Sequence, residues 1–214
     1  SLFYQRPVAS IVADALTNTL WMGVPALILG FAAGMMLGAL HGVAGRRPLG
    51  RCLDLFSTVS LSLPSLLLGL MALLLAAHTH WFPLGGMNSL ESSSAGFLPW
   101  IADRVRHLIL PVACLTLPVL ASVERIQYAA TRGLHEELYL RFARSRGLGS
   151  FRFFFHYILR PGMNPVLSIS GPMLGGVLSG SLVLEVIFTW PGLGQITYDA
   201  LFNNDLFLLA GCIV

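Results

Sequence analysis

Long stretches of this chain contain no charged side chain. These stretches cover residues 15–45, 55–90, 107–123 and 161–184. A helix that crosses a membrane needs about 20 mostly apolar residues. The pattern therefore predicts spanning helices over about 17–41, 53–77, 107–130 and 164–190, and a further one that starts near residue 206 and is truncated at Val214.

Smaller features refine these predicted spans. Residues 1–16 carry apolar side chains on one helical face, which predicts an amphipathic lead-in at the membrane interface. Pro64 lies in the middle of the second span and is expected to bend it. Gly30, Gly34 and Gly38 recur every four residues in the first span. Such a face of small residues lets a second helix approach closely.

The composition agrees with a membrane protein. Hydrophobic residues make up 55% of the chain and charged residues only 11%, and the mean hydropathy is +0.74. A typical soluble domain has about 25% charged residues, and 214 residues could not cover four buried helices in water. The predicted fold class is all-α: a polytopic helical membrane protein, with residues 1–214 forming a single transmembrane domain.

The charges indicate the topology. The formal net charge is +3, and every basic residue is Arg. Most Arg residues lie in segments 42–52 and 131–163, which the positive-inside rule places on the cytoplasmic side. Segments 78–106 and 191–194 are then external. The Arg residues do not alternate with aromatic ones, so the sequence gives no indication of nucleic-acid binding.

The cytoplasmic loop 131–163 has a helix–glycine–helix pattern. Leu134, Leu138 and Phe142 share one helical face. Gly147 is expected to end this helix as a left-handed cap. Aromatic residues then begin a second short helix. Two short helices between two spans make a shape suited to docking in a groove of a partner protein.

Three motifs resemble one family of membrane proteins. Residues 139–148 read Tyr-Leu-Arg-Phe-Ala-Arg-Ser-Arg-Gly-Leu, and residues 184–194 read Leu-Glu-Val-Ile-Phe-Thr-Trp-Pro-Gly-Leu-Gly. The first resembles the EAA loop of ABC-importer permeases of the dipeptide, oligopeptide and nickel family, which runs approximately Tyr-Ile-Arg-Thr-Ala-Arg-Ala-Lys-Gly-Leu. The second resembles that family's Val-Glu-x-Val-Phe-x-x-Pro-Gly-Leu-Gly. A weaker third match leads from Arg6-Pro7-Val8 to Asn18-Thr19-Leu20.

The chain also departs from the family pattern. Leu138 stands where the family usually has Asp, and Pro161 stands where it has Asn. Pro161 is expected to break the helix just before the fourth span. The family's first span would precede residue 1, and most of its last span would follow Val214. We therefore expect this sequence to be part of a longer chain.

The resemblance implies a transport subunit of the bacterial inner membrane, not an enzyme. Its fold would be the transmembrane domain of a type I ABC importer with a cytoplasmic coupling helix. Its partners would be a second permease subunit, usually in a heterodimer, two cytoplasmic ATPase subunits and an extracytoplasmic substrate-binding protein. This chain would bind no cofactor itself, because ATP and magnesium would be held by the ATPase subunits.

The resemblance also implies which residues couple the chain to the ATPase. We expect Leu140, Phe142, Leu148 and Phe151 to form the buried anchor, since apolar and aromatic side chains dominate such interfaces. The whole predicted coupling set is Glu136, Glu137, Leu140, Arg141, Phe142, Ala143, Arg144, Arg146, Gly147, Leu148 and Phe151.

The second motif leaves two interpretations open. Glu185, Pro191, Gly192 and Gly194 either line the translocation pathway or hold the turn together. An acid within a span is a functional candidate by default, and it could attract positively charged cargo. Because Glu185 belongs to one motif with the turn, a structural role is favoured.

Other polar residues are weaker candidates. Glu124 and Arg125 lie at the inner end of the third span and could gate the cytoplasmic mouth, although Arg125 could equally extend to the interface. His78 and His80 could bind a metal ion, but two His residues at this spacing are a weak signal.

Three alternative functions stay open. One is a permease for nickel or another small solute. The others, from different classes, are a membrane scaffold subunit and an intramembrane enzyme. The enzyme would need a nucleophile with a base, or a metal cluster, at membrane depth, and the sequence has no His-Glu-x-x-His motif.

Overall fold

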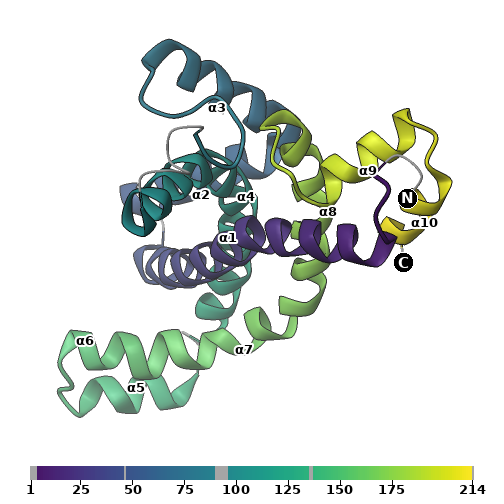
Figure 1. The fold of residues 1–214 in the computed structure, drawn as a ribbon. Helices are drawn as coiled ribbons and strands as arrows, with labels where there is room; N and C mark the ends of the chain where they lie inside the picture. The colour runs from purple at the N-terminus through teal and green to yellow at the C-terminus, as the bar shows by residue number, and fades with distance from the viewer. Residues whose placement is uncertain (1–3, 46, 90–95, 135–136, 214) are drawn as a thin grey trace. The chain divides into compact units, whose positions relative to one another are not determined.

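The structure, a computed structural model, describes residues 4–45, 47–89, 96–134 and 137–213 (Figure 1). Its regular elements are helical, and none of these described residues lies in a β-strand, so the predicted all-α class is confirmed. In chain order the elements are α1 (Val8–Ala44), α2 (Pro48–Ser62), α3 (Ser65–Thr79), α4 (Phe97–Leu134), α5 (Leu138–Ser145), α6 (Ser150–Phe153), a π-helical turn η2 (Phe154–Leu159), α7 (Arg160–Ser168), α8 (Ser170–Ile187), α9 (Leu193–Phe202) and α10 (Leu206–Ile213).

Within the described ranges, α1, α4 and α8 are long and apolar enough to cross a membrane. Helices α2 and α3 add a fourth crossing if they form one broken span. Helix α1 begins at Val8 and runs without a break through most of the predicted lead-in 1–16. The reason is packing: Ile11 and Ala15 are buried in an apolar cluster with α9 and α10, which favours continuous helix over a separate surface element.

Two predicted spans are interrupted where proline removes a backbone donor. Helix α2 ends before Pro64, and Leu63 has the extended backbone, φ −87° and ψ 120°, that a residue before proline prefers. The predicted span 164–190 is interrupted at Ile169, between α7 and α8. Pro172 cannot donate to the carbonyl four residues earlier, so the helix restarts with Pro172 in its first turn.

The chain divides into two compact units. Unit 1 contains Ser1–Ala26, Pro64–Leu115 and Gly176–Val214, and unit 2 contains Leu27–Leu63 and Thr116–Gly175. In unit 1, the first turns of α1 pack against α9 and α10. In unit 2, the second half of α1 packs against α4, and the helices α5 to α7 follow from the end of α4.

The glycine face of α1 contacts α4 directly. A Cβ atom added at Gly30 would meet Val119, and one added at Gly34 would meet Val123. The predicted close approach at Gly30, Gly34 and Gly38 is therefore confirmed. It extends by one further turn to Gly42, where an added Cβ atom would meet Thr131.

Candidate functional site

Residues 137–159 of unit 2 form a helical hairpin, with α5 and α6 side by side (Figure 1). Gly147 turns the chain between them with φ +67°, in the left-handed region that glycine adopts without strain. Helix α5 has a buried and an exposed face. Leu140 is buried against Ala39 of α1 and Ile158 of η2, whereas Phe142 is 70% exposed and Phe151 on α6 is 77% exposed.

The hairpin separates the predicted coupling residues into two groups. Leu140 and Ala143 are buried within unit 2, so Leu140 fills the chain's own core and does not offer the anchor expected from the sequence. Glu137, Phe142, Arg146, Gly147 and Phe151 are exposed, and Leu148 is half-buried. Arg141 and Arg144 belong to α5, and Glu136 lies outside the described residues.

Pro161 does not break the helix as its position in the sequence predicted. It occupies the first turn of α7, and the helical backbone continues into α7 from the π-helical turn η2. Pro161 has no backbone N–H, and it follows a π-helical turn in which the Arg160 N–H bonds the Phe155 carbonyl, five residues earlier. The Tyr139 hydroxyl of α5 donates to the Tyr157 carbonyl of this turn at 3.4 Å. Partial burial, and then the negative charge of Glu137, raise the pKa of Tyr139 above its usual value, so this hydroxyl keeps its proton.

In unit 1, the Pro-Gly-Leu-Gly turn is tied to the Asn18-Thr19 motif of α1. The Trp190 indole N–H donates to the Asn18 carbonyl at 2.9 Å. The Asn18 amide in turn donates to the Pro191 carbonyl at 2.8 Å, and the Leu193 N–H donates to the Thr19 hydroxyl at 2.9 Å. Two motifs more than 170 residues apart in the chain therefore form one hydrogen-bonded structure.

Glu185 is buried inside this structure. Its Oε2 atom accepts the Gly194 N–H at 2.6 Å. A Cβ atom added at Gly192 would collide with the Glu185 carboxyl group, so only glycine leaves room for the acid beneath the turn. This placement supports the structural interpretation of Glu185, Pro191, Gly192 and Gly194 over the pathway interpretation.

Substitutions at Glu185 provide a test of that structural role. Glu185→Gln keeps an oxygen that can accept the Gly194 N–H, so we expect unchanged yield and melting temperature in the purified protein. Glu185→Leu leaves that N–H buried without an acceptor, which costs about 1–3 kcal/mol and should lower the melting temperature. Equal stability of the Leu and Gln variants would contradict the structural role.

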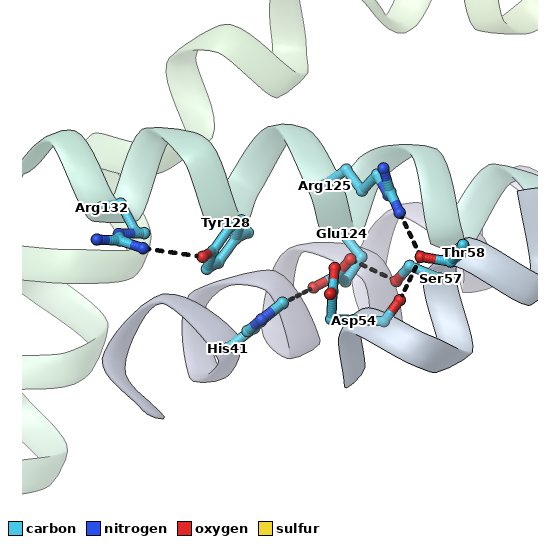
Figure 2. A network of polar contacts seen from close by, with 8 residues as sticks. All are labelled: His41, Asp54, Ser57, Thr58, Glu124, Arg125, Tyr128 and Arg132. Atoms are coloured by element: carbon cyan, nitrogen blue, oxygen red, sulfur yellow. Dashed lines mark hydrogen bonds and ion pairs between the residues drawn. The ribbon is translucent and has the colours of Figure 1, made fainter. Parts of the chain in front are cut away.

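A buried polar cluster joins three helices of unit 2 (Figure 2). Glu124 of α4 lies between His41 of α1 and Ser57 of α2. The His41 Nδ1–H donates to one carboxylate oxygen at 2.6 Å, and the Ser57 hydroxyl donates to the other at 2.5 Å. The His41 ring also stacks on Tyr128, with 3.9 Å between the ring centroids.

A second contact runs along the exposed side of the cluster. The Arg125 guanidinium donates to the Thr58 hydroxyl at 2.6 Å, and that hydroxyl donates to the Asp54 carbonyl at 2.7 Å (Figure 2). Arg125 therefore makes a hydrogen bond to α2. The alternative considered from the sequence was a side chain that only extends to the membrane interface. Glu124 was a candidate from the sequence, but its partners His41 and Ser57 were missed. The available signal was a His and a Glu at the predicted cytoplasmic ends of two apolar spans.

The arrangement of the cluster does not fit nucleophilic catalysis. A serine nucleophile needs the imidazole between the hydroxyl and the acid, so that the imidazole can take the hydroxyl proton. Here the carboxylate of Glu124 lies between Ser57 and His41 (Figure 2). Among the residues that the structure describes, no group of three His, Cys, Asp or Glu side chains could hold a metal ion. His78 and His80 lie at the end of α3, where His80 forms the helix cap.

Comparison with known families identifies the class of protein. Residues 30–214 match the family described as the inner membrane component of binding-protein-dependent transport systems. The chain belongs to this family. The match covers both units and includes the hairpin, the Pro-Gly-Leu-Gly turn and the His41–Glu124 cluster, so this permease family provides the context for each site.

Two relatives are named as peptide permeases. The chain is 32% identical to the oligopeptide transport system permease protein AppB of Bacillus subtilis, over 93% of this chain and 62% of that protein. It is 29% identical to a probable peptide ABC transporter permease of Sinorhizobium fredii, over 96% of this chain and 64% of that protein. The chain thus spans less than two thirds of the length of these relatives.

A solved structure shares the fold. The MetNI methionine ABC transporter in inward-facing conformations superposes with a TM-score of 0.69 at 17% identity, covering 92% of this chain and 82% of that one. At this identity the likeness concerns the fold alone. This permease chain therefore has a helical fold like that of an ABC-importer membrane subunit. Its family, described as an inner membrane component, and its long apolar helices make it a multi-pass membrane protein.

Proposed function

We propose that this chain forms half of the translocation pathway of an ATP-driven peptide importer in a bacterial inner membrane. Its family membership supports a transport role, and the relatives named as oligopeptide and peptide permeases support peptides as the cargo. A permease for nickel or another small solute is the alternative within the same family. Uptake of labelled peptides and of radioactive nickel by the assembled transporter distinguishes the two.

The proposed transporter contains four further subunits. A second permease subunit, different in sequence, would complete the pathway. Two cytoplasmic ATPase subunits would bind ATP and magnesium, and an extracytoplasmic binding protein would deliver the peptide. The chain itself would bind no cofactor. In this arrangement the permease contributes the pathway and the contact through which closure of the ATPase pair reaches the spanning helices.

The exposed aromatic side chains of the hairpin carry the coupling proposal. Phe142 and Phe151 are more than two thirds exposed on a segment whose ends connect to α4 and α7. Their burial in a groove of an ATPase subunit would supply apolar contact area. The loop 131–163 has six Arg and two Glu residues, so an acidic rim on that groove would match its charge. Leu140, which packs against Ala39 and Ile158, would keep α5 from tilting.

The coupling proposal is tested by removing the two aromatic side chains together. In the assembled transporter, Phe142→Ala with Phe151→Ala should reduce copurification of the ATPase subunits and abolish peptide-stimulated ATP hydrolysis, since hot-spot side chains each contribute about 2 kcal/mol or more. Phe207→Ala is the matched control, because Phe207 on α10 is 69% exposed but lies outside the hairpin. Normal stimulation in the double variant would refute docking by the hairpin.

A further inference from the structure

The face of α1 that meets α4 has a row of glycines, which contribute no side chain of their own to the contact. Its contact positions are Gly30, Gly34, Gly38 and Gly42. Helices usually set their alignment by fitting ridges of side chains into grooves. At the glycine positions the contact comes from side chains of α4, such as Val119 and Val123, that lie close to the α1 backbone. Such contacts are non-directional, so a directional contact can add to the definition of the alignment.

A buried polar stripe lies on α4 at the end of this contact. Glu124, Gln127 and Thr131 follow at spacings of three and four residues, which places them on one face of the helix. All three side chains are buried, with at most 1% exposed. Hydrogen bonds are directional, so contacts of this stripe can help to define the alignment of the helices.

Glu124 makes contacts from the stripe to two other helices. Its two carboxylate oxygens accept one hydrogen bond from His41 of α1 and one from Ser57 of α2. A buried pair of this kind gives little stability over well-packed apolar residues of the same size, because both groups lose their hydration. The best-attested use of a buried polar group is to select one register between helices.

The same alignment positions both ends of the hairpin. Leu140 of α5 packs on Ala39 of α1, which precedes His41 by two residues. Gly162 of α7 lies against the Gln127 side chain, which an added Cβ atom at residue 162 would strike. If α1 shifted along α4, Leu140 would lose its contact with Ala39, while α7 would keep its contact with Gln127 of α4.

We propose that Glu124 is a positioning residue for coupled transport. By binding His41 and Ser57, it fixes the register of α1 and α2 on α4, and so holds the hairpin in the orientation that docks with the ATPase. This role rests on the proposed function. It assigns to Glu124 an action through the hairpin, with no contact to cargo or nucleotide.

The test compares three variants of the transporter assembled with all its subunits. Glu124→Gln keeps an acceptor for His41 and a polar partner for Ser57, so the ratio of peptide imported to ATP hydrolysed should stay within about twofold. Glu124→Leu combined with His41→Leu replaces the pair by apolar residues. This variant should lose little stability, because the freed Ser57 hydroxyl can rotate to the carbonyl four residues earlier in its own helix. The transport ratio should fall by roughly 5- to 150-fold, the usual range for coupling between sites.

His107→Leu is the matched control. His107 is also a buried histidine, but its ring bonds the Asp103 carbonyl of its own helix α4 at 2.9 Å, so its loss should leave the ratio unchanged. If the double Leu variant does not accumulate, Ser57→Ala takes its place. It releases α2 alone, and it should still lower the transport ratio.

The outcomes separate the two proposals. A wild-type transport ratio in the double Leu variant, or in Ser57→Ala when that variant replaces it, overturns the positioning role and leaves the cluster as structural. Absence of ATP-dependent peptide uptake by the wild-type transporter would instead overturn the proposed function. A wild-type transport ratio in Glu124→Gln, together with a lower ratio in the double Leu variant, supports the positioning role. A purely stabilising pair would alter the melting temperature and not the ratio.

Discussion

Gly34→Leu should prevent the folded permease from accumulating in the membrane. The first side-chain carbon at this position would come within 2.8 Å of the Leu120 carbonyl oxygen and 2.7 Å of the Val123 Cβ atom, and Leu adds three further carbons. Since the Leu120 carbonyl belongs to the backbone of α4, rotation of a side chain cannot relieve the clash. Overpacking usually costs about 1–3 kcal/mol, and we expect this variant to exceed that range.

The measurement is the amount of monodisperse protein after detergent extraction, with its melting temperature. Gly175→Leu is the matched control, because Gly175 lies in helix α8 and an added Cβ atom there meets nothing within 4 Å. Both variants replace a helical glycine by the same residue, so intrinsic helix propensity cancels between them. Comparable losses in the two variants would show that the glycine face of α1 is not a close contact.

Trp190→Ala should cause the largest loss of stability within unit 1. The Trp190 side chain is 0% exposed, and its N–H bonds the Asn18 carbonyl. Truncation of a buried Trp or Phe typically costs about 3–5 kcal/mol, through lost packing and the cavity left behind. The turn at residues 191–194 would also lose the side chain that ties it to α1.

Two further variants separate the contributions to the Trp190 effect. Trp190→Phe keeps most of the packing and removes the N–H, so it should cost only about 1–3 kcal/mol for the carbonyl left without its donor. Trp81→Ala is the control, since Trp81 is 79% exposed and its loss should leave the melting temperature unchanged. A Trp190→Ala variant as stable as Trp81→Ala would contradict the contacts described for the turn.

The all-α class and the helix–glycine–helix pattern were predictable from the sequence because each follows from local rules. Charge-free runs and a glycine after an amphipathic segment depend only on neighbours in the chain. The Gly30, Gly34 and Gly38 face was predictable as a contact surface, but not its partner α4. Many helices could approach such a face, and the sequence holds no signal that selects one.

The contacts between distant residues were not predictable in the same way. Leu140 was expected to bind a partner, but it packs inside the chain. Apolar periodicity cannot distinguish a side chain that packs inward from one that docks outward. The pairing of His41 with Glu124 depends on which spans are neighbours. The motif that contains Asn18 and Thr19 was recognised from its resemblance, but its contact with Trp190 and Leu193 required the fold.

The hydroxyl of Tyr139 links α5 to the turn before Pro161. Pro161 lies just after the π-helical turn η2, and the hydroxyl of Tyr139 donates to the carbonyl of Tyr157 inside that turn. A phenylalanine at position 139 would keep the ring and remove this link between α5 and η2. Because the acceptor is a backbone atom, the link depends on the residue at position 139 and persists whichever side chain stands at position 157.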